Sequence, residues 1–139
     1  MINGADVDGR VWERLTAAVT TGDAYCRANA VERIDLLKID VEGAENLVLD
    51  GFWDMFSQGR IACVQFEFGM LNIYSKFLLK DFWDLLTGHG FTLGPIMPDG
   101  VWFRDYDPRD EDFNGPPNFF AVHHARPDLI AAVRRGRAS

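Results

Sequence analysis

Ile34-Asp-Leu-Leu-Lys-Ile-Asp-Val-Glu-Gly-Ala-Glu45 is the stretch of sequence that decides the fold. It begins with a mostly apolar run, 36–40, which ends in an acid and is followed at once by the glycine-containing turn 42–44. A short apolar run, a turn and then an amphipathic segment predict a strand, a tight turn and a helix. We expect the helix to break near Gly51 and to end at Gly59, where glycine fills a left-handed cap without steric cost.

The same pattern of strand and helix recurs along the chain. Ile61 to Phe68 is a second apolar run, continuous enough in β-branched and aromatic residues to predict a strand buried on both faces. Leu78, Phe82 and Leu86 recur at helical spacing and predict a helix over 77–87. The other predicted elements are a short helix over 23–29 capped by Asp23, strands at 91–96 and 118–123, a hairpin arm at 101–103 and a helix over 128–134.

Strand and helix alternating twice, with strands returning near the end, predict an α/β fold. We expect a partial doubly wound, Rossmann-like and mainly parallel sheet, with helices on both faces and an antiparallel strand at one edge. The chain has 139 residues, of which 47% are apolar, so residues 1–139 are expected to form a single domain.

Charge and cysteine content restrict the possible partners. The formal net charge is -7, which repels phosphate backbones, so we expect no nucleic-acid partner. No apolar run approaches the roughly 20 residues of a membrane helix, so no membrane partner is expected either. The two cysteines, Cys26 and Cys63, fall in a predicted helix and a predicted buried strand. We expect reduced, packed thiols and a cytoplasmic protein, with a disulfide between them as the alternative.

Acidic residues stand where the two predicted parallel strands end. Asp40 closes the first strand and Glu67 the second, while Glu42 lies in the turn that enters the helix. Ligands of open α/β sheets bind beyond the carboxyl ends of the strands, so these acids are candidates to share one ligand. Asp40 or Glu42 could instead only cap the following helix. A divalent cation is a further alternative, but no histidine accompanies the acids at ligand spacing and we expect no metal site.

The stretch Ile34 to Glu45 resembles the signature block of FkbM-type methyltransferases, which reads "iDllKiDvEGaE". The resemblance continues on both sides: 20–26 resembles the family's "tLDdyc" segment, 65–69 its next strand end and 117–122 its final strand. It covers roughly residues 18–124. Gly22 stands where the family usually has leucine, which predicts a looser short helix at that point.

The resemblance implies the carboxy-terminal half of a class I methyltransferase sheet, with strands four to seven at 36–40, 61–68, 91–96 and 118–123. It implies transfer of a methyl group from S-adenosylmethionine to an oxygen of a small molecule or sugar. Asp40 and Glu67 would be the catalytic residues, as orienting group or general base, and Asp40 and Glu42 would contact the cofactor.

One part of the family pattern is missing before residue 20. A class I enzyme needs a glycine-rich turn after its first strand and an acid about 20 residues later. We therefore expect the amino-terminal, cofactor-binding half to be absent and the first strand of this chain to form an exposed sheet edge. Exposed edges invite pairing, so a homodimer in which two half-sheets join is expected. The alternative to an enzyme is a truncated, non-catalytic module that oligomerises or binds a partner.

Overall fold

The structure is a computed structural model, and it describes residues 16–136. Its helices are α1 (Gly22–Ala28), α2 (Glu45–Gly51), α3 (Trp53–Ser57), α4 (Asn72–Ser75), α5 (Leu79–Gly88) and α6 (Pro127–Val133), with a 3-10 turn at Pro108–Asp110. Its strands are β1 (Ile34–Ile39), β2 (Ile61–Glu67), β3 (Phe91–Met97), β4 (Gly100–Val101) and β5 (Asn118–His123). Within the described residues no helix is long and apolar enough to cross a membrane.

The predicted elements are present, with two local differences. The helix after β1 breaks at Gly51 as expected, and Gly59 has a φ of +62°, the left-handed geometry that the glycine cap requires. The stretch 69–75, expected to be a loop, contains the short helix α4. Helix α1 is capped by Thr21, whose hydroxyl accepts a hydrogen bond from the amide of Ala24 at 3.2 Å, and not by Asp23.

Gly22 at the start of α1 has a packing reason. A Cβ atom built at this position would lie 2.3 Å from the Phe52 ring. The ring therefore occupies the space that a leucine at position 22 would need, and the glycine lets α1 approach the α2–α3 junction closely.

The strands form one sheet in the order β1-β2-β5-β3-β4. Among the strands of the described residues, only β1 and β2 pair in parallel, with Ile34 opposite Ile61 and Ile39 opposite Phe66. The expectation of a mainly parallel sheet is therefore wrong. Strand β5 inserts between β2 and β3 and runs opposite to both, so β3 points the same way as β1 and β2 yet has only antiparallel neighbours. Strands β4 and β5 both run opposite to β3 and lie on its two sides, so residues 102–117 cross from one edge of β3 to the other before β5 begins. The short antiparallel strand β4 does lie at an edge, as expected.

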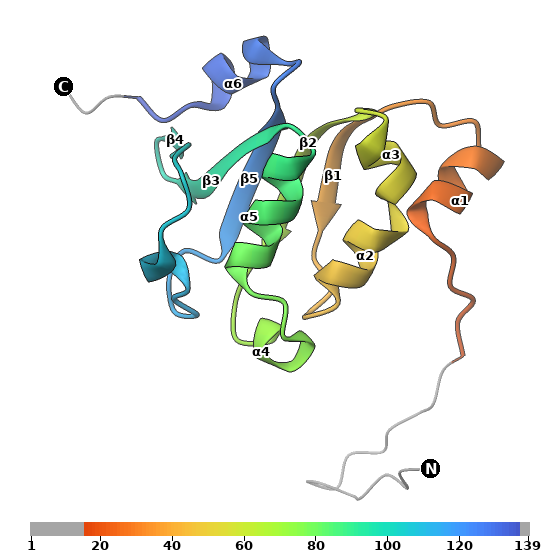
Figure 1. Ribbon diagram of the computed structural model, residues 1–139, viewed down its shortest axis with the longest axis horizontal. Coiled ribbons are helices and arrows are strands. Elements are labelled where there is room, and N and C mark those ends of the chain that lie inside the picture. The colour runs from red at the N-terminus through yellow and green to blue at the C-terminus, as the bar shows by residue number, and fades with distance from the viewer. Residues whose placement is uncertain (1–15, 137–139) are drawn as a thin grey trace, which may run out of the picture.

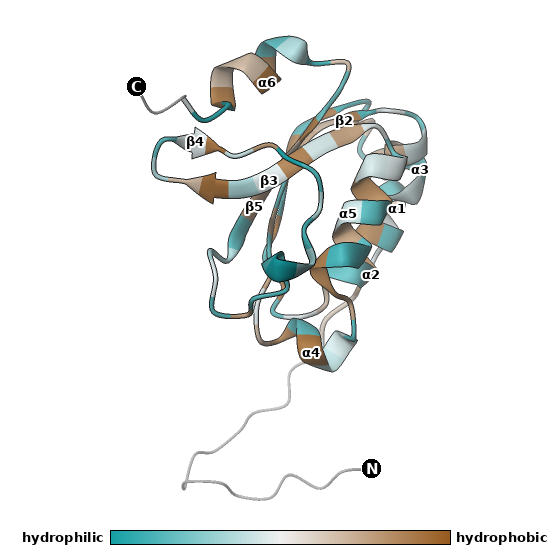
Figure 2. Ribbon diagram, turned by 60° about the vertical axis from the view of Figure 1, so that its left-hand side comes forward, coloured by the Kyte–Doolittle hydropathy of each residue, from teal (hydrophilic) through white to brown (hydrophobic). Residues whose placement is uncertain are grey.

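Most of the helices cover one face of the sheet. Figure 2 shows α1, α2, α3 and α5 on one side and α6 on the other. The main core lies under the first group, where Phe66 stacks on Phe82 at 4.3 Å between ring centroids. A smaller cluster forms under α6, where Leu129 and Ile130 pack near Cys63. Helices thus occur on both faces, but unevenly, and a doubly wound arrangement is not confirmed.

Strand β1 lies at the end of the sheet (Figure 1), and among the described residues it pairs only with β2. Its Leu36 side chain is 51% exposed. Both cysteines are buried and free, so no disulfide joins Cys26 to Cys63.

Candidate functional site

The loop that follows β1 has an unusual backbone. Glu42 and Gly43 both have positive φ, at 55° and 97°, and α2 begins two residues later at Glu45. A non-glycine residue in this region is strained by about 1–3 kcal/mol, and such strain gathers at functional sites. At Gly43 a Cβ atom would lie 2.9 Å from the carbonyl oxygen of Leu71, so a side chain there would push the two loops apart.

The loop that follows β2 turns tightly beside the first one. The amide of Phe68 donates to the carbonyl of Pro117 at 2.8 Å, which ties the end of β2 to the residue preceding β5. The amide of Gly69 donates to Oδ1 of Asn72 at 2.9 Å, which closes the turn into α4. Both loops thus leave the carboxyl ends of neighbouring parallel strands and meet at one end of the sheet (Figure 1).

Two buried polar side chains join these loops. Nδ2 of Asn72 donates to Oε2 of Glu45 at 3.1 Å, and the other carboxylate oxygen of Glu45 accepts from the amide of Gly43 at 3.0 Å. Both side chains are only 3% exposed. We call the set formed by Glu45, Asn72 and the amides of Gly43 and Gly69 the clasp. Burial of a polar group without a partner is costly, so the full pairing of these atoms holds the loops in one arrangement.

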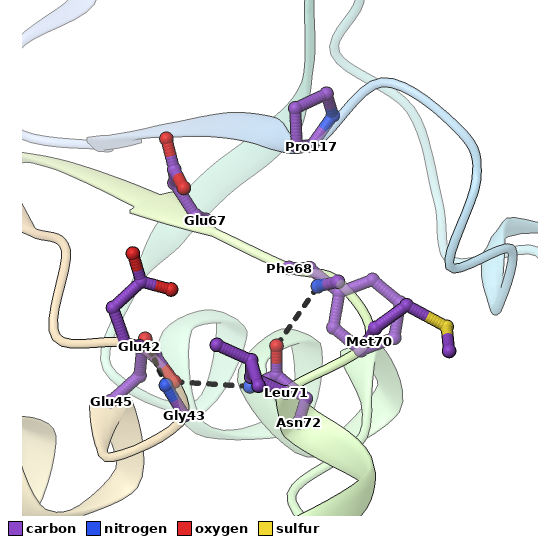
Figure 3. A pocket seen from close by; sticks show the side chains of 10 residues that line it. Glu42, Gly43, Glu45, Glu67, Phe68, Met70, Leu71, Asn72 and Pro117 are labelled. Atoms are coloured by element: carbon purple, nitrogen blue, oxygen red, sulfur yellow. Dashed lines mark hydrogen bonds between the residues drawn. The ribbon is translucent and has the colours of Figure 1, made fainter. Parts of the chain in front are cut away.

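A cavity of about 120 Å³ lies between the loops, next to the clasp (Figure 3). It is lined by Glu42, Gly43, Glu45, Glu67, Phe68, Gly69, Met70, Leu71, Asn72 and Pro117. The carboxylates of Glu42 and Glu67 extend in the same general direction, away from Asn72 (Figure 3). One small cavity therefore has an acidic side and an apolar side.

The structure brings together two of the three predicted acids. Glu42 and Glu67 line the cavity, whereas Asp40 does not and instead accepts a hydrogen bond from Nζ of Lys38. That hydrogen bond is the main reason why the pKa of Lys38 is raised above its ordinary value, and the charge of Glu67 contributes to the same rise. Lys38 therefore lies within the electrostatic influence of both strand-end acids.

The prediction from sequence did not include Glu45 and Asn72. Glu45 is the last residue of the signature stretch. It was not selected as a site residue, because an acid in the first turn of a helix is already explained by its favourable interaction with the helix dipole. Asn72 lies in a stretch that was expected to be a loop, and no local pattern pointed to it.

A hollow of about 170 Å³ lies beside Pro95 and Phe119, and two larger ones, of about 350 and 370 Å³, are both lined by Arg60. Arg60 precedes β2, so these two larger hollows are at the amino ends of the parallel strands. Ligands of open α/β sheets bind at the opposite end. The cavity of about 120 Å³ is the candidate site, because of these four hollows it alone is lined by Glu42 and Glu67.

Residues 9–93, more than half of the chain, match the Methyltransferase FkbM domain. The chain belongs to the FkbM methyltransferase family. The match includes β1, the strained loop, the clasp and β2, and it ends inside β3. No curated protein and no solved structure showed significant similarity to the chain.

Membership of the FkbM family implies S-adenosylmethionine as the methyl donor at the level of the family. The described residues do not fit the whole of this cofactor. Pockets that enclose ligands of this size measure about 300–1,000 Å³, and the cavity between the loops has about 120 Å³. In the part of the chain that the structure describes, no glycine-rich turn connects a strand to a helix beside β1. Within the same residues no group of three or more His, Cys, Asp or Glu side chains could hold a metal ion.

Proposed function

We propose that this chain works in a methyltransferase that transfers the methyl group of S-adenosylmethionine to a hydroxyl oxygen of a small molecule or sugar. The observation that carries the proposal is the pair Glu42, in the loop after β1, and Glu67, at the end of the adjacent parallel strand β2. The two side chains line one cavity in an FkbM-family chain. The strained backbone at Glu42 supports it, because such geometry is kept where a side chain must be aimed.

The acids give the site a defined task toward the acceptor. With S-adenosylmethionine bound, the hydroxyl oxygen would form its bond to the methyl carbon as the carbon–sulfur bond breaks and S-adenosylhomocysteine is released, and the hydroxyl proton has to leave. Glu67 can accept that proton as general base or orient the hydroxyl by a hydrogen bond, and Asp40, held by Lys38, is the alternative. The fixed position of the carboxylate relative to the hydroxyl would contribute most of the effect, because it converts an encounter into a preorganised contact.

Asp40 and Glu42 are the proposed contacts to the cofactor. Both lie in the segment that follows β1, next to the free edge of the sheet, where the rest of a cofactor site would have to be added. The cavity can accept only a fragment of the cofactor, so further polypeptide beside β1 is part of the proposal. A cytoplasmic location, in agreement with the two free and buried cysteines, is part of it as well.

Isothermal titration calorimetry with S-adenosylhomocysteine, the demethylated product, tests cofactor binding directly. We expect weak but saturable heat with the unchanged chain, from the fragment of the ligand that the cavity accepts, and its loss in Asp40→Ala and Glu42→Gln. Asp128→Asn is the matched control. Asp128 is an exposed acid on α6, it pairs with Arg126, and it lies away from Asp40, Glu42 and Glu67. Absence of heat with the unchanged chain, in a protein that is folded by circular dichroism, would overturn cofactor binding by this chain.

Transfer of radiolabel from methyl-labelled S-adenosylmethionine to a panel of alcohols and sugars tests the reaction. With the chain joined to the further polypeptide that the proposal places beside β1, we expect labelled ether products with at least one acceptor. We expect a loss of about 10²-fold or more in Glu67→Gln, the size of effect typical of a general base. Labelling that is unchanged by both Glu67→Gln and Asp40→Asn would exclude the proposed role of these acids.

A non-catalytic module that oligomerises is the second candidate, and the edge of β1, which has no strand partner there among residues 16–136, favours it. Two copies could join their half-sheets along Ile34–Ile39, and Leu36, half exposed on this strand, would lie in the joint. We expect a homodimer by light scattering and its dissociation in Leu36→Lys. Leu47→Lys is the matched control, since Leu47 is 67% exposed on α2. A monodisperse monomer at high concentration contradicts the dimer.

A further inference from the structure

The clasp connects the two loops that carry the acids of the site. Glu45 begins α2, directly after the loop of Glu42, and Asn72 begins α4, a few residues after Glu67. These two side chains are separated by 27 positions in the sequence, yet their contact is direct and buried. Figure 3 shows the hydrogen bond between these two side chains, which joins the loop of Glu42 to the loop that follows Glu67.

Every polar atom that the clasp uses has a defined partner. The Glu45 carboxylate accepts from the amide of Gly43 and from Asn72, and Asn72 in turn accepts from the amide of Gly69. The chain of bonds thus runs from one loop backbone through two side chains to the other loop backbone. Gly43 also lies against the Leu71 carbonyl, where an added Cβ atom would come within 2.9 Å of the oxygen, so the two loop backbones are in close contact at this point.

A simple stabilising role would not require this arrangement. A buried carboxylate without a cation beside it is costly, and an apolar pair of similar size would join the loops with less desolvation. A polar clasp adds direction, because its hydrogen bonds have preferred lengths and angles and so select one register of the two loops. The register that they select is the one in which Glu42 keeps its strained backbone.

We propose that Glu45 and Asn72 are a pair of positioning residues, which hold Glu42 and Glu67 at a fixed separation on the same side of the cavity. Their role in catalysis rests on the proposed methyltransferase function. The separation itself does not, so it can be tested without any cofactor or acceptor.

The separation is measured with spin labels on the full chain carrying Glu42→Cys and Glu67→Cys, from the dipolar broadening of the electron paramagnetic resonance spectrum. The native Cys26 and Cys63 are buried, and singly substituted chains give the background from any label they take up. We expect a narrow distance distribution in this parent chain. When Asn72→Ala is added, we expect the distribution to widen or shift to longer distance. Asn118→Ala is the matched control, because it removes a polar contact to Gln65 near the same strand ends without touching the clasp.

An exchanged pair separates positioning from general stability. Asn72→Asp alone places two carboxylates at a hydrogen-bonding distance, and Glu45→Gln alone removes the charge that the amide group contacts. With both changes together, the amide at position 45 can donate to the carboxylate at position 72, while both loop amides keep an oxygen acceptor. We expect the double exchange to restore the narrow distribution that each single change loses.

Hydrogen exchange gives a second readout on the chain without labels. In Asn72→Ala we expect the amide of Gly69 to exchange about fivefold to tenfold faster, since it loses its acceptor. The amide of Gly43 keeps its acceptor on Glu45 in this variant. We nevertheless expect it to exchange faster, because the Glu45 carboxylate loses its hydrogen bond from Asn72 and no longer has a fixed position. The proposal is overturned if Asn72→Ala lowers the melting temperature but leaves the distance between positions 42 and 67 unchanged, or if the double exchange fails to restore that distance.

Discussion

Asp23 of helix α1 caps helix α3. Its two carboxylate oxygens accept hydrogen bonds from the backbone amides of Met55 at 3.1 Å and Asp54 at 2.9 Å, in the first turn of α3. Asp23 is largely buried, at 9% exposure. Helix α3 has no cap from its own preceding residue, Phe52, so an acid from 31 positions earlier supplies it.

We expect Asp23→Ala to lower the free energy of unfolding by about 1–3 kcal/mol, because it leaves two amides without a partner. Asp23→Asn keeps one acceptor oxygen and should cost less. Thr21→Ala, which removes the ordinary cap of α1, is the comparison and should cost about 0.5–2 kcal/mol. Urea denaturation followed by circular dichroism measures all three. Equal, small effects of Asp23→Ala and Asp23→Asn would contradict the cap across helices.

We expect the hydroxyl group of Tyr106 to ionise only at unusually high pH. Burial raises its pKa from 10.0 to about 12, and its hydroxyl group donates to Oε1 of Glu111 at 2.8 Å, which adds to the rise. Because its pKa is raised in the folded state, folding favours the neutral form of the Tyr106 hydroxyl. The stabilisation that this neutral hydroxyl gives the folded state is complete below pH 10 and is lost as pH rises from 10 through 12. Absorbance titration of tyrosinate, compared with Tyr106→Phe, checks it. A last tyrosine titrating near 10 in the folded chain would rule out this environment.

Asp107 is expected to remain ionised at low pH. The Arg109 side chain, by its hydrogen bonds, lowers the pKa of Asp107 from 3.8 to about 2. The stabilisation is therefore present above about pH 4 and is lost as pH falls through 2. Carboxyl carbon NMR should show the pKa of Asp107 moving back toward 3.8 in Arg109→Ala, and in high salt as well, because the pair lies at the surface. No movement in either case would contradict the pairing.

Gly94 of β3 lies against the backbone of Trp102 and Phe103, the two residues that follow β4. A Cβ atom at this position would lie 2.0 Å from the carbonyl oxygen of Trp102, and backbone cannot yield as a side chain does. We expect Gly94→Ala to destabilise the fold by about 3 kcal/mol or more. Gly88→Ala is the control, since nothing lies within 4 Å of its Cβ position, and it should be neutral or slightly stabilising. Thermal unfolding of both variants checks the difference.

The sequence predicted the elements of the fold better than their assembly. The breaks at Gly51 and Gly59, the strands β2 and β3 and the hairpin into β4 follow local patterns of apolar spacing and turn residues. The predicted pairing of the strands was wrong, because the neighbours of a strand depend on which distant segment of the chain packs beside it. Nothing in the sequence of β5 indicates that it inserts between β2 and β3.

The site divides in the same way. Glu67 was found from sequence because an acid at the end of an apolar strand is a local signal, and Glu42 because it lies in the turn that enters the next helix. The structure places both on one cavity. Asp40 carries the same signal, but the structure pairs it with Lys38, outside the lining of that cavity. Which way each side chain extends depends on the twist and pairing of the strands, which the local pattern does not contain.

By itself, the sequence determined the family, the succession of strands and helices and the two acids that close adjacent strands, because each of these is a pattern among near neighbours in the chain. Only the tertiary structure decided the insertion of β5, the cap from Asp23 to α3 and the clasp between Glu45 and Asn72. These are contacts between residues far apart in sequence, and they form only after burial removes water as the competing hydrogen-bond partner.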